Sequence, residues 1–393
     1  MAALSPTHTA IAGLGITEQG KVYGKSAVGW AVEAIRLALD DAGLEPADLD
    51  GVLVNPGMSW GMAGTMGSFA VQQAMGLRDL SLGASVSLGG ASAGAMIMQA
   101  ALAIEAGMAS HVACVFSDAP LMPPKPRDGK KATGSASAYA HSAGLDMAYG
   151  VFGVAGRYAW LAQRHMHRFG TTQDQLGTIA VNERAFAQGN PHAEFRGKPL
   201  TLDDYHASRW VTEPFHLLDC CLVSNGGVAV VVTSAERARD LRRPPVHVRG
   251  MAQGHPGGDP LETLTSGAVT AGPAALRMAG VELGDIDFCE LYDCYTFTVL
   301  VTLEDYGFCP KGEGGAFIEE GRTGPGGELP VNTGGGQLSS YYMWGMTPIS
   351  EAVIQIRGDG GERQADAHEL GLVSGNGGIL STHSTLVLGR SAA

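Results

Sequence analysis

The stretch ALDDAGLEPADLDGVLV (38–54) decides the fold, because the chain contains a second version of it. It aligns without gaps with ALRMAGVELGDIDFCEL (275–291), and the identical aligned pairs include Ala38/Ala275, Leu39/Leu276, Ala42/Ala279, Gly43/Gly280, Asp48/Asp285 and Asp50/Asp287. In each copy a glycine ends a predicted helix, an Asp-x-Asp turn follows, and a strand begins. The chain is therefore predicted to contain an internal duplication.

A second pair of segments extends this duplication. GAMIMQAALAIEAG (94–107) matches GMTPISEAVIQIRG (345–358), and each reads as a helix closed by glycine after a glycine-rich turn. Extending this register backwards places Tyr342 opposite Ala91. The stretch QLSSYYMWGMTPISEA (337–352) is accordingly predicted to open a helix that has two adjacent tyrosines at its start.

The order of elements indicates an α/β protein. The first copy reads as a strand at 10–16, an amphipathic helix at 28–43 and a strand at 50–54, which is a β-α-β unit. At 393 residues, with 45% hydrophobic and 17% charged residues, the chain is long enough for two core-bearing units.

The two halves are predicted to be residues 1–240 and 241–393. A Pro-Pro pair and a charge cluster mark the boundary near residue 240. Residues from about 118 to 215 have no counterpart in the second half. We expect them to form an insertion that lies over the first half, where such insertions often cover a ligand cleft.

Charge and composition exclude several kinds of partner. The net charge is −13 without a block of lysine or arginine, so we expect no nucleic acid binding. The chain has no run of about 18 apolar residues and no signal-peptide pattern, so we expect a cytoplasmic protein without a membrane span. The six cysteines show no zinc-type C-x2-C pairs, and we expect them to be reduced and no metal to bind.

Three further segments carry a family resemblance: PFHLLDCCLVSNGGVAVVVTS (214–234), DIDFCELYDCYTFTVL (285–300) and FIEEGRTGPGGELPVNTGGGQLS (317–339). With the repeated stretch, they make the chain resemble the thiolase superfamily over nearly its whole length, in the branch related to sterol-carrier-protein-linked thiolases. The resemblance implies an α/β thiolase fold with two duplicated α-β-α-β-α halves, each with a five-stranded mixed sheet. It also implies a homodimer.

The chain departs from this family at the reactive positions. Thiolases use a nucleophilic cysteine, a Gly-His-Pro histidine and a second cysteine in a C-terminal glycine-rich loop. Here Ala91, or in another alignment Gly90, stands at the first cysteine, and Tyr342 stands at the histidine. The second cysteine is replaced by one of three residues: Ser374, Gly375 or Asn376.

A different chemistry is predicted from what remains. Acyl transfer through an acyl-enzyme needs a thiolate with a nearby base, and neither stands at the expected positions. The segment that contributes the oxyanion site in related thiolases instead carries Tyr292. A phenol with a pKa near 10 donates a proton unaided, and we expect the field of a helix N-terminus to let it act as a base.

The resemblance is nearest to tyrosine-for-histidine aldolases that complete steroid side-chain degradation. It implies retro-aldol cleavage of a bulky β-hydroxyacyl-CoA into a ketone or aldehyde plus propionyl-CoA or acetyl-CoA. Tyr292 and Tyr342 are the predicted acid/base pair, with their separate roles left open. The alternatives are thiolase-like acyl transfer, for instance through Cys294, and a non-catalytic subunit that binds acyl-CoA.

Other residues complete the prediction. Possible supporting residues are Asp293, Cys294, His383 and Asn332, and the predicted oxyanion and CoA region consists of Gly90, Ala91, Gly335, Gly336, Asn376 and Gly377. We expect no cofactor in this chain, since coenzyme A is part of the substrate. The resemblance also implies a small zinc-ribbon and OB-fold partner, which would carry the zinc and complete a heterotetramer.

Overall fold

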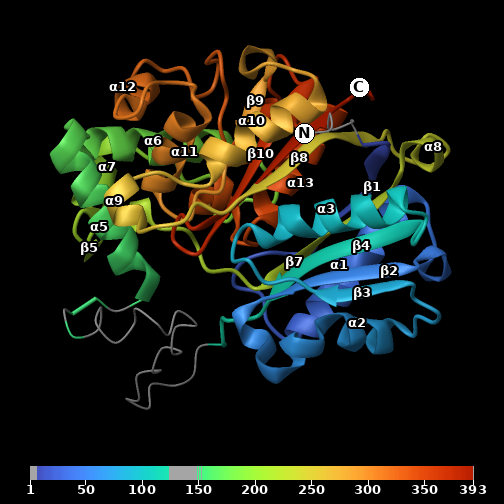
Figure 1. The fold of residues 1–393 in the computed structure, drawn as a ribbon. Helices are drawn as coiled ribbons and strands as arrows, with labels where there is room; N and C mark the ends of the chain where they lie inside the picture. Colours follow the sequence, from blue (N-terminus) through green and yellow to red (C-terminus); the bar gives the residue numbers. More distant parts are fainter. Residues whose placement is uncertain (1–6, 124–147, 149, 152, 393) are drawn as a thin grey trace.

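The computed structural model describes residues 7–123, 148, 150–151 and 153–392, and these form one layered α/β molecule (Figure 1). The strands are β1 (Thr9–Ile16), β2 (Gly51–Pro56), β3 (Leu82–Ser85), β4 (His111–Asp118), β5 (Trp210–Thr212), β6 (Phe215–His216), β7 (Gly226–Ser234), β8 (Val246–Gly254), β9 (Phe288–Glu290), β10 (Leu370–Gly377) and β11 (Thr382–Gly389). The helices are α1 (Ala27–Ala42), α2 (Gly67–Met75), α3 (Ser92–Glu105), α5 (Gly153–Phe169), α6 (Gln173–Ala187), α7 (Leu202–Ala207), α8 (Ala235–Ala238), α9 (Pro260–Thr263), α10 (Ala268–Ala279), α11 (Thr296–Tyr306), α12 (Gly314–Glu319) and α13 (Met346–Arg357).

The duplication appears in the order of the strands. Within the described residues, nine strands run β3-β2-β4-β7-β1 and then β8-β11-β10-β9. The second set repeats the first in mirror order, with β8 matching β1 and β9 matching β2. Two residue pairs, Ala10 with His247 and Ile11 with Val246, join the two sets across β1 and β8. We propose the boundary between the halves near residue 240, because the connection between these two sets falls there.

The first half has the predicted five strands, and the second half has four. The fifth position of the second half is a single parallel bridge between Cys289 and Val331. Val331 belongs to the chain that precedes η5 (Gly336–Ser340), and one bridge pair is too short to be a strand. The second half therefore has four strands and one bridge pair in place of the predicted five strands.

The repeated aspartates explain why the two copies share their sequence. Asp50 precedes β2 and accepts a hydrogen bond from the backbone N–H of His111 at 2.9 Å, at the start of β4. Asp287 precedes β9 and accepts one from the N–H of Leu370 at 2.8 Å, at the start of β10. Each carboxylate therefore fixes the register of a parallel strand pair, β2 with β4 and β9 with β10.

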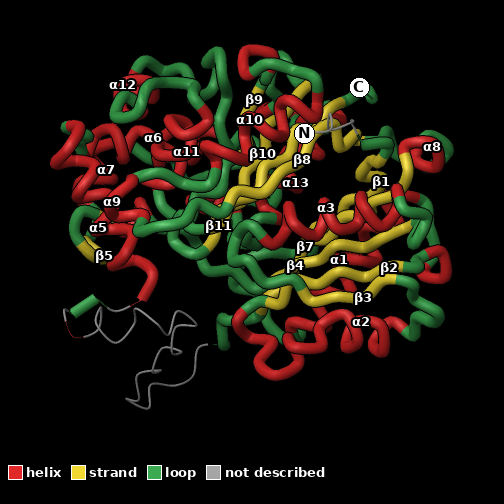
Figure 2. The backbone as a smooth tube through the Cα atoms, viewed as in Figure 1, coloured by secondary structure: helices red, strands yellow, loops and turns green. Residues whose placement is uncertain are grey.

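Helices α3 and α13 lie between the two halves and form the central layer (Figure 2). Their apolar side chains, such as Met96 and Ile349, share one buried cluster with Val230 of β7 and Val373 of β10. Helices α1 and α2 cover the outer face of the first half, and α10 and α11 cover the outer face of the second. The five layers follow from strands that are buried on both faces.

The inserted region packs against the second half, so the prediction that it lies over the first half is wrong. Figure 1 shows α5, α6 and α7 beside α11 and α12. A buried hydrogen bond of 3.0 Å between His165 Nε2 of α5 and Glu304 Oε2 of α11 fixes this arrangement. The physical reason is that apolar side chains such as Leu161 and Leu176 complete the core around α11. Residues 124–147, 149 and 152 of the predicted insertion lie outside the described residues.

The helix predicted to start at the two tyrosines begins later. Residues 336–340 form one π-type turn, Tyr341 is extended, and α13 starts at Met346. Trp344 has a φ of 49°, in the left-handed region, and this conformation cannot continue a right-handed helix. Tyr342 therefore lies in the approach to α13. In the part of the chain that the structure describes, no helix has the length and apolarity of a membrane span.

Candidate active site

The two predicted acid/base residues meet in the structure. The hydroxyl oxygens of Tyr292 and Tyr342 lie 3.3 Å apart, and either hydroxyl can be the donor. Tyr292 follows β9 and is 4% exposed, whereas Tyr342 precedes α13 and is partly exposed. These two positions are 50 residues apart in sequence. Tyr292 is thus buried in the core, whereas part of Tyr342 is accessible to solvent.

Backbone hydrogen bonds to serine hydroxyls fix the position of each tyrosine. The N–H of Tyr292 donates to Ser374 Oγ at 2.9 Å, and the N–H of Tyr342 donates to Ser224 Oγ at 3.1 Å. Ser374 was one of three candidates for the second cysteine position, and its role here is to hold the main chain. The backbone at both phenols is therefore restrained by buried partners.

Asp293 ties the two tyrosine-bearing segments together without touching either hydroxyl. Its carboxylate accepts hydrogen bonds from the N–H groups of Gln337 at 2.6 Å and Leu338 at 3.0 Å, both in η5. Burial raises the pKa of the neighbouring Glu183 well above its usual range, and the proximity of Asp293 acts in the same direction, so Glu183 is a neutral acid. Asp293 is a structural anchor for the turn that leads to Tyr342.

Three other predicted positions belong to the same support. Asn332 Oδ1 accepts the N–H of Leu291 at 2.6 Å, next to Tyr292. Gly335 and Gly336 start η5, and a Cβ on Gly336 would lie 2.2 Å from the carboxylate of Asp293. These residues therefore support the two segments that carry Tyr292 and Tyr342.

Gly90 makes the closest approach to the pair. A Cβ at this position would lie 2.1 Å from the ring of Tyr292 and 2.4 Å from the carbonyl oxygen of Asn376. Real contacts of this kind are not found, so only glycine fits. Ala91 caps α3 directly after it. The space that a side chain at Gly90 would need is filled by the Tyr292 ring.

Both phenols are neutral in this environment. Burial, together with the proximity of Tyr342, raises the pKa of Tyr292 well above its usual value of 10. Burial and the nearby thiol of Cys221 raise the pKa of Tyr342 in the same direction. The expectation that a helix N-terminus favours a tyrosinate is therefore wrong: α13 starts four residues after Tyr342.

Two thiols flank the tyrosines, and both are protonated at neutral pH. Burial raises the pKa of Cys294 to about 12 and that of Cys221 well above its usual range. A thiol in this state is a poor nucleophile. Sequence reasoning missed Cys221, although its segment carries the resemblance. The backbone hydrogen bond from its N–H to the Cys294 carbonyl, at 3.1 Å, helps to bring it to the site.

Of the remaining predicted residues, His383 lies beside Tyr306, whereas Asn376 and Gly377 lie near the tyrosine pair. His383 Nε2 is hydrogen-bonded to the hydroxyl of Tyr306 at 2.9 Å, and burial lowers its pKa to about 3, so it is a neutral packing residue. Asn376 lies near the tyrosines and its Nδ2 donates to the hydroxyl of Tyr158 at 3.2 Å. Gly377 lets the end of β10 approach the carbonyl of Leu88 before α3. Tyr158 was not predicted, because it lies in the inserted region without a counterpart in the repeat.

A buried carboxylate, Asp219, joins the inserted region to the site. It accepts hydrogen bonds from Tyr205 Oη of α7 at 2.8 Å and from Thr296 Oγ1 of α11 at 2.5 Å. It also accepts the N–H of His216 at 2.7 Å. Thr296 follows the segment of Tyr292, and Asp219 precedes the segment of Cys221 and Ser224. The three contacts therefore hold both sides of the tyrosine pair.

We expect Asp219 to make the stability of the protein depend on pH. Burial raises its pKa from 3.8 to about 6. Its contribution is complete below about pH 4 and is lost as the pH rises through 6, a change of about 3 kcal/mol. Asp219→Asn cannot ionise, so the free energy of unfolding of the wild type should fall relative to the variant between pH 4 and 7. Urea unfolding across this range measures it, and a pH-independent difference would contradict it.

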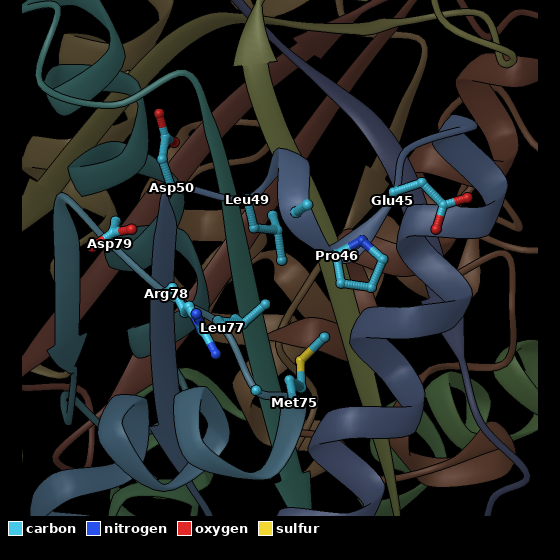
Figure 3. Close-up of a pocket in the computed structure, with 10 residues that line it drawn as sticks. Glu45, Pro46, Leu49, Asp50, Met75, Leu77, Arg78 and Asp79 are labelled. Atoms are coloured by element: carbon cyan, nitrogen blue, oxygen red, sulfur yellow. The ribbon is translucent and has the colours of Figure 1, made fainter.

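A separate hollow of about 590 Å³ lies in the first half (Figure 3). Leu49 and Asp50, before β2, and Leu77 and Arg78, before β3, are among the residues that line it. It is therefore at the amino-terminal edge of these parallel strands. Gly90 follows the carboxyl end of β3, so this hollow is not part of the candidate active site.

Comparison with known proteins places this arrangement in a family. A family model described as "Thiolase C-terminal domain-like" matches residues 253–390. The chain is 37% identical to a "Steroid side-chain-cleaving aldolase" of Thermomonospora curvata, over 95% of this chain and 96% of that protein. It is also 37% identical to the "17-hydroxy-3-oxo-4-pregnene-20-carboxyl-CoA lyase" of Mycobacterium tuberculosis, over 94% and 97% of the two chains.

Solved structures agree with this result. The chain in the structure "Ltp2-ChsH2(DUF35) aldolase" superposes with a TM-score of 0.87 at 36% identity, over 99% of both chains. An acetyl-CoA acetyltransferase from Syntrophomonas wolfei, at 16% identity and a TM-score of 0.71, shares the fold. By its layered duplicated halves and these full-length relatives, the chain belongs to the thiolase superfamily, with relatives of the aldolase type.

Proposed function

We propose that this protein cleaves a carbon–carbon bond of a bulky β-hydroxyacyl-CoA by a retro-aldol reaction. The substrate is of the steroid side-chain type, and the products are a ketone or aldehyde plus propionyl-CoA or acetyl-CoA. The observation that carries the proposal is the 3.3 Å contact between the Tyr292 and Tyr342 hydroxyls. The names of the two relatives at 37% identity, an aldolase and a lyase, support it.

The neutral state of both phenols suggests how the proton moves. One phenol accepts the proton of the substrate hydroxyl as it passes its own proton to the other phenol. In the same step the bond between Cα and Cβ breaks, Cβ becomes a carbonyl, and the electron pair moves onto Cα and the thioester as an enolate-like charge. The second phenol gives its own proton to Cα as it receives the proton of the first phenol, so neither oxygen carries two protons. This relay restores both phenols and requires no tyrosinate, which burial would make costly.

The relay also distinguishes the proposal from acyl transfer. Acyl transfer through Cys294 would need a thiolate, and burial holds the pKa of this thiol at about 12. A non-catalytic acyl-CoA-binding subunit would have no need for two buried hydroxyls in contact. Both alternatives predict a different result in the test below.

The proposal includes assembly with a partner. The similar solved structure is a complex of Ltp2 with ChsH2(DUF35), and we propose that this chain binds a small DUF35-type protein of zinc-ribbon and OB-fold construction. Any zinc would then belong to that partner. The proposal further includes a homodimer of this chain and a cytoplasmic location.

The test is an assay of the protein co-expressed with a DUF35-type partner from the same genome. We expect release of a short acyl-CoA from a thioester with a tertiary β-hydroxyl, and none from the matching thioester without that hydroxyl. Cys221→Ser with Cys294→Ser should retain cleavage, and hydroxylamine should trap no acyl-enzyme. An acyl group on either thiol would support acyl transfer, and binding without cleavage would support the non-catalytic alternative.

A further inference from the structure

Helix α5 of the inserted region brings a third phenol to the tyrosine pair. Tyr158 is 2% exposed, and its ring packs against that of Tyr295 with centroids 4.9 Å apart. Its hydroxyl lies beside the thiol of Cys294, and Tyr292 is close enough to contribute to the rise in the pKa of Tyr158 that burial causes. A residue 134 positions before Tyr292 in sequence is therefore part of the same buried cluster.

The hydroxyl of Tyr158 is hydrogen-bonded to the side-chain amide of Asn376, and only one end of this amide has a hydrogen-bond partner among the described residues. Asn376 is 2% exposed, and its Nδ2 donates to the hydroxyl of Tyr158 at 3.2 Å. Its Oδ1 has no hydrogen-bond partner among the described residues. A buried amide oxygen left unpaired destabilises the protein, and a bound ligand that forms the missing hydrogen bond would recover this loss. This amide is therefore ready to bind one polar group of a ligand.

The amide can present either of its ends to that ligand. The oxygen and nitrogen ends occupy nearly the same volume, and a rotation by 180° exchanges them. The hydroxyl of Tyr158 can accept from Nδ2 or donate to Oδ1. When it donates to Oδ1, the NH₂ group of Asn376 becomes a free donor.

The main chain of Asn376 lies beside the tyrosine pair, next to its amide side chain. Its carbonyl oxygen lies 2.4 Å from the point that a Cβ on Gly90 would occupy, and the Tyr292 ring lies 2.1 Å from the same point. The backbone of Asn376 and the ring of Tyr292 thus meet at Gly90. Cleavage of the Cα–Cβ bond places negative charge on the thioester oxygen, and a fixed donor there stabilises the transition state.

We infer that Asn376 donates a hydrogen bond to the thioester oxygen, and that Tyr158 is the positioning residue that sets the orientation of this amide. The inference rests on the proposed function and deepens it, because it gives the inserted helix a role in the reaction. The tyrosine pair moves the proton, and the amide stabilises the enolate.

The experiment is a double-mutant cycle on the protein with its partner. Asn376→Ala should lower kcat by about 100-fold or more, the effect of removing one oxyanion donor. Tyr158→Phe keeps the ring and should lower kcat by about 10-fold, while KM changes less than twofold. In the Asn376→Ala background, Tyr158→Phe should have no further effect on kcat. Tyr295→Phe, which removes a neighbouring hydroxyl from the same ring stack, is the matched control and should retain kcat.

Several outcomes would overturn the inference. If the fold-losses in kcat of the two single variants multiply in the double variant, Tyr158 does not act through Asn376. A change in KM alone would make both residues binding residues. If Asn376→Ala does not fold, Asn376→Leu replaces it; this side chain has a similar shape and no donor, and it should also lower kcat by about 100-fold or more. Full activity of the Tyr158 and Asn376 variants, with loss of activity in Tyr292→Phe, would refute this inference and leave the proposed function standing.

Discussion

Replacing either tyrosine of the pair by phenylalanine is expected to lower kcat for carbon–carbon cleavage by at least about 100-fold, the usual contribution of a general acid or base. Tyr292→Phe and Tyr342→Phe keep the packing of the ring and remove only the hydroxyl. Because the proposed relay passes through both hydroxyls, the double variant should be little worse than either single variant. Steady-state release of acyl-CoA measures this effect.

Tyr341→Phe is the matched control for these variants. Tyr341 is adjacent to Tyr342 and has the same side chain, but its hydroxyl is hydrogen-bonded to Ser350 Oγ at 2.7 Å in the central layer. We expect this variant to lose about 1 kcal/mol of stability and to keep its activity. If Tyr292→Phe and Tyr342→Phe both cleave at the wild-type rate, the acid/base assignment is wrong.

Gly90→Ala is expected to abolish cleavage and to destabilise the protein by about 1 to 3 kcal/mol, because a methyl group is forced into filled space. Its Cβ would lie 2.1 Å from the Tyr292 ring, so the phenol has to leave its position near Tyr342. Thermal unfolding and the cleavage assay together measure both effects. Gly90→Cys should behave in the same way, and it should not create a thiolase, because the thiol would displace the ring.

Gly29→Ala provides the control for the Gly90 variants. Gly29 lies in α1, and a Cβ there would lie 3.5 Å from Ser26 Oγ, an ordinary contact. This variant should keep full activity and be slightly stabilised, since alanine favours helices more than glycine does. Retention of cleavage by Gly90→Ala would mean that Tyr292 is not needed in its present position.

Elements that are formed by local interactions could be predicted from the sequence. The helix predicted at 28–43 is α1, with Gly43 as its left-handed C-cap, and the strand predicted at 10–16 is β1. These elements are predictable because apolar periodicity and capping act over a few residues. The contact between Tyr292 and Tyr342 was anticipated only because the repeat and the family resemblance relate positions far apart in sequence.

Sequence reasoning failed where long-range packing decides. The inserted helices could cover either half, and apolar side chains such as Leu161 do not specify which core they complete. The start of α13 depends on the left-handed backbone of Trp344, whose ring stacks on Phe116 of β4 at 5.2 Å. The field of a helix N-terminus was expected to let a phenol act as a base, whereas the pKa of each phenol rises, because burial cannot be read from the order of residues.

The sequence by itself determined the duplicated α/β fold and the loss of the thiolase nucleophile. Both follow from local patterns and from which residue type stands at each repeated position. Only the tertiary structure decided that Gly90 leaves room for the Tyr292 ring, that both phenols are neutral, and that Tyr158 reaches Asn376 across 218 residues. Distances, burial and electrostatic fields depend on contacts between segments that are remote in the chain, and these contacts exist only after folding.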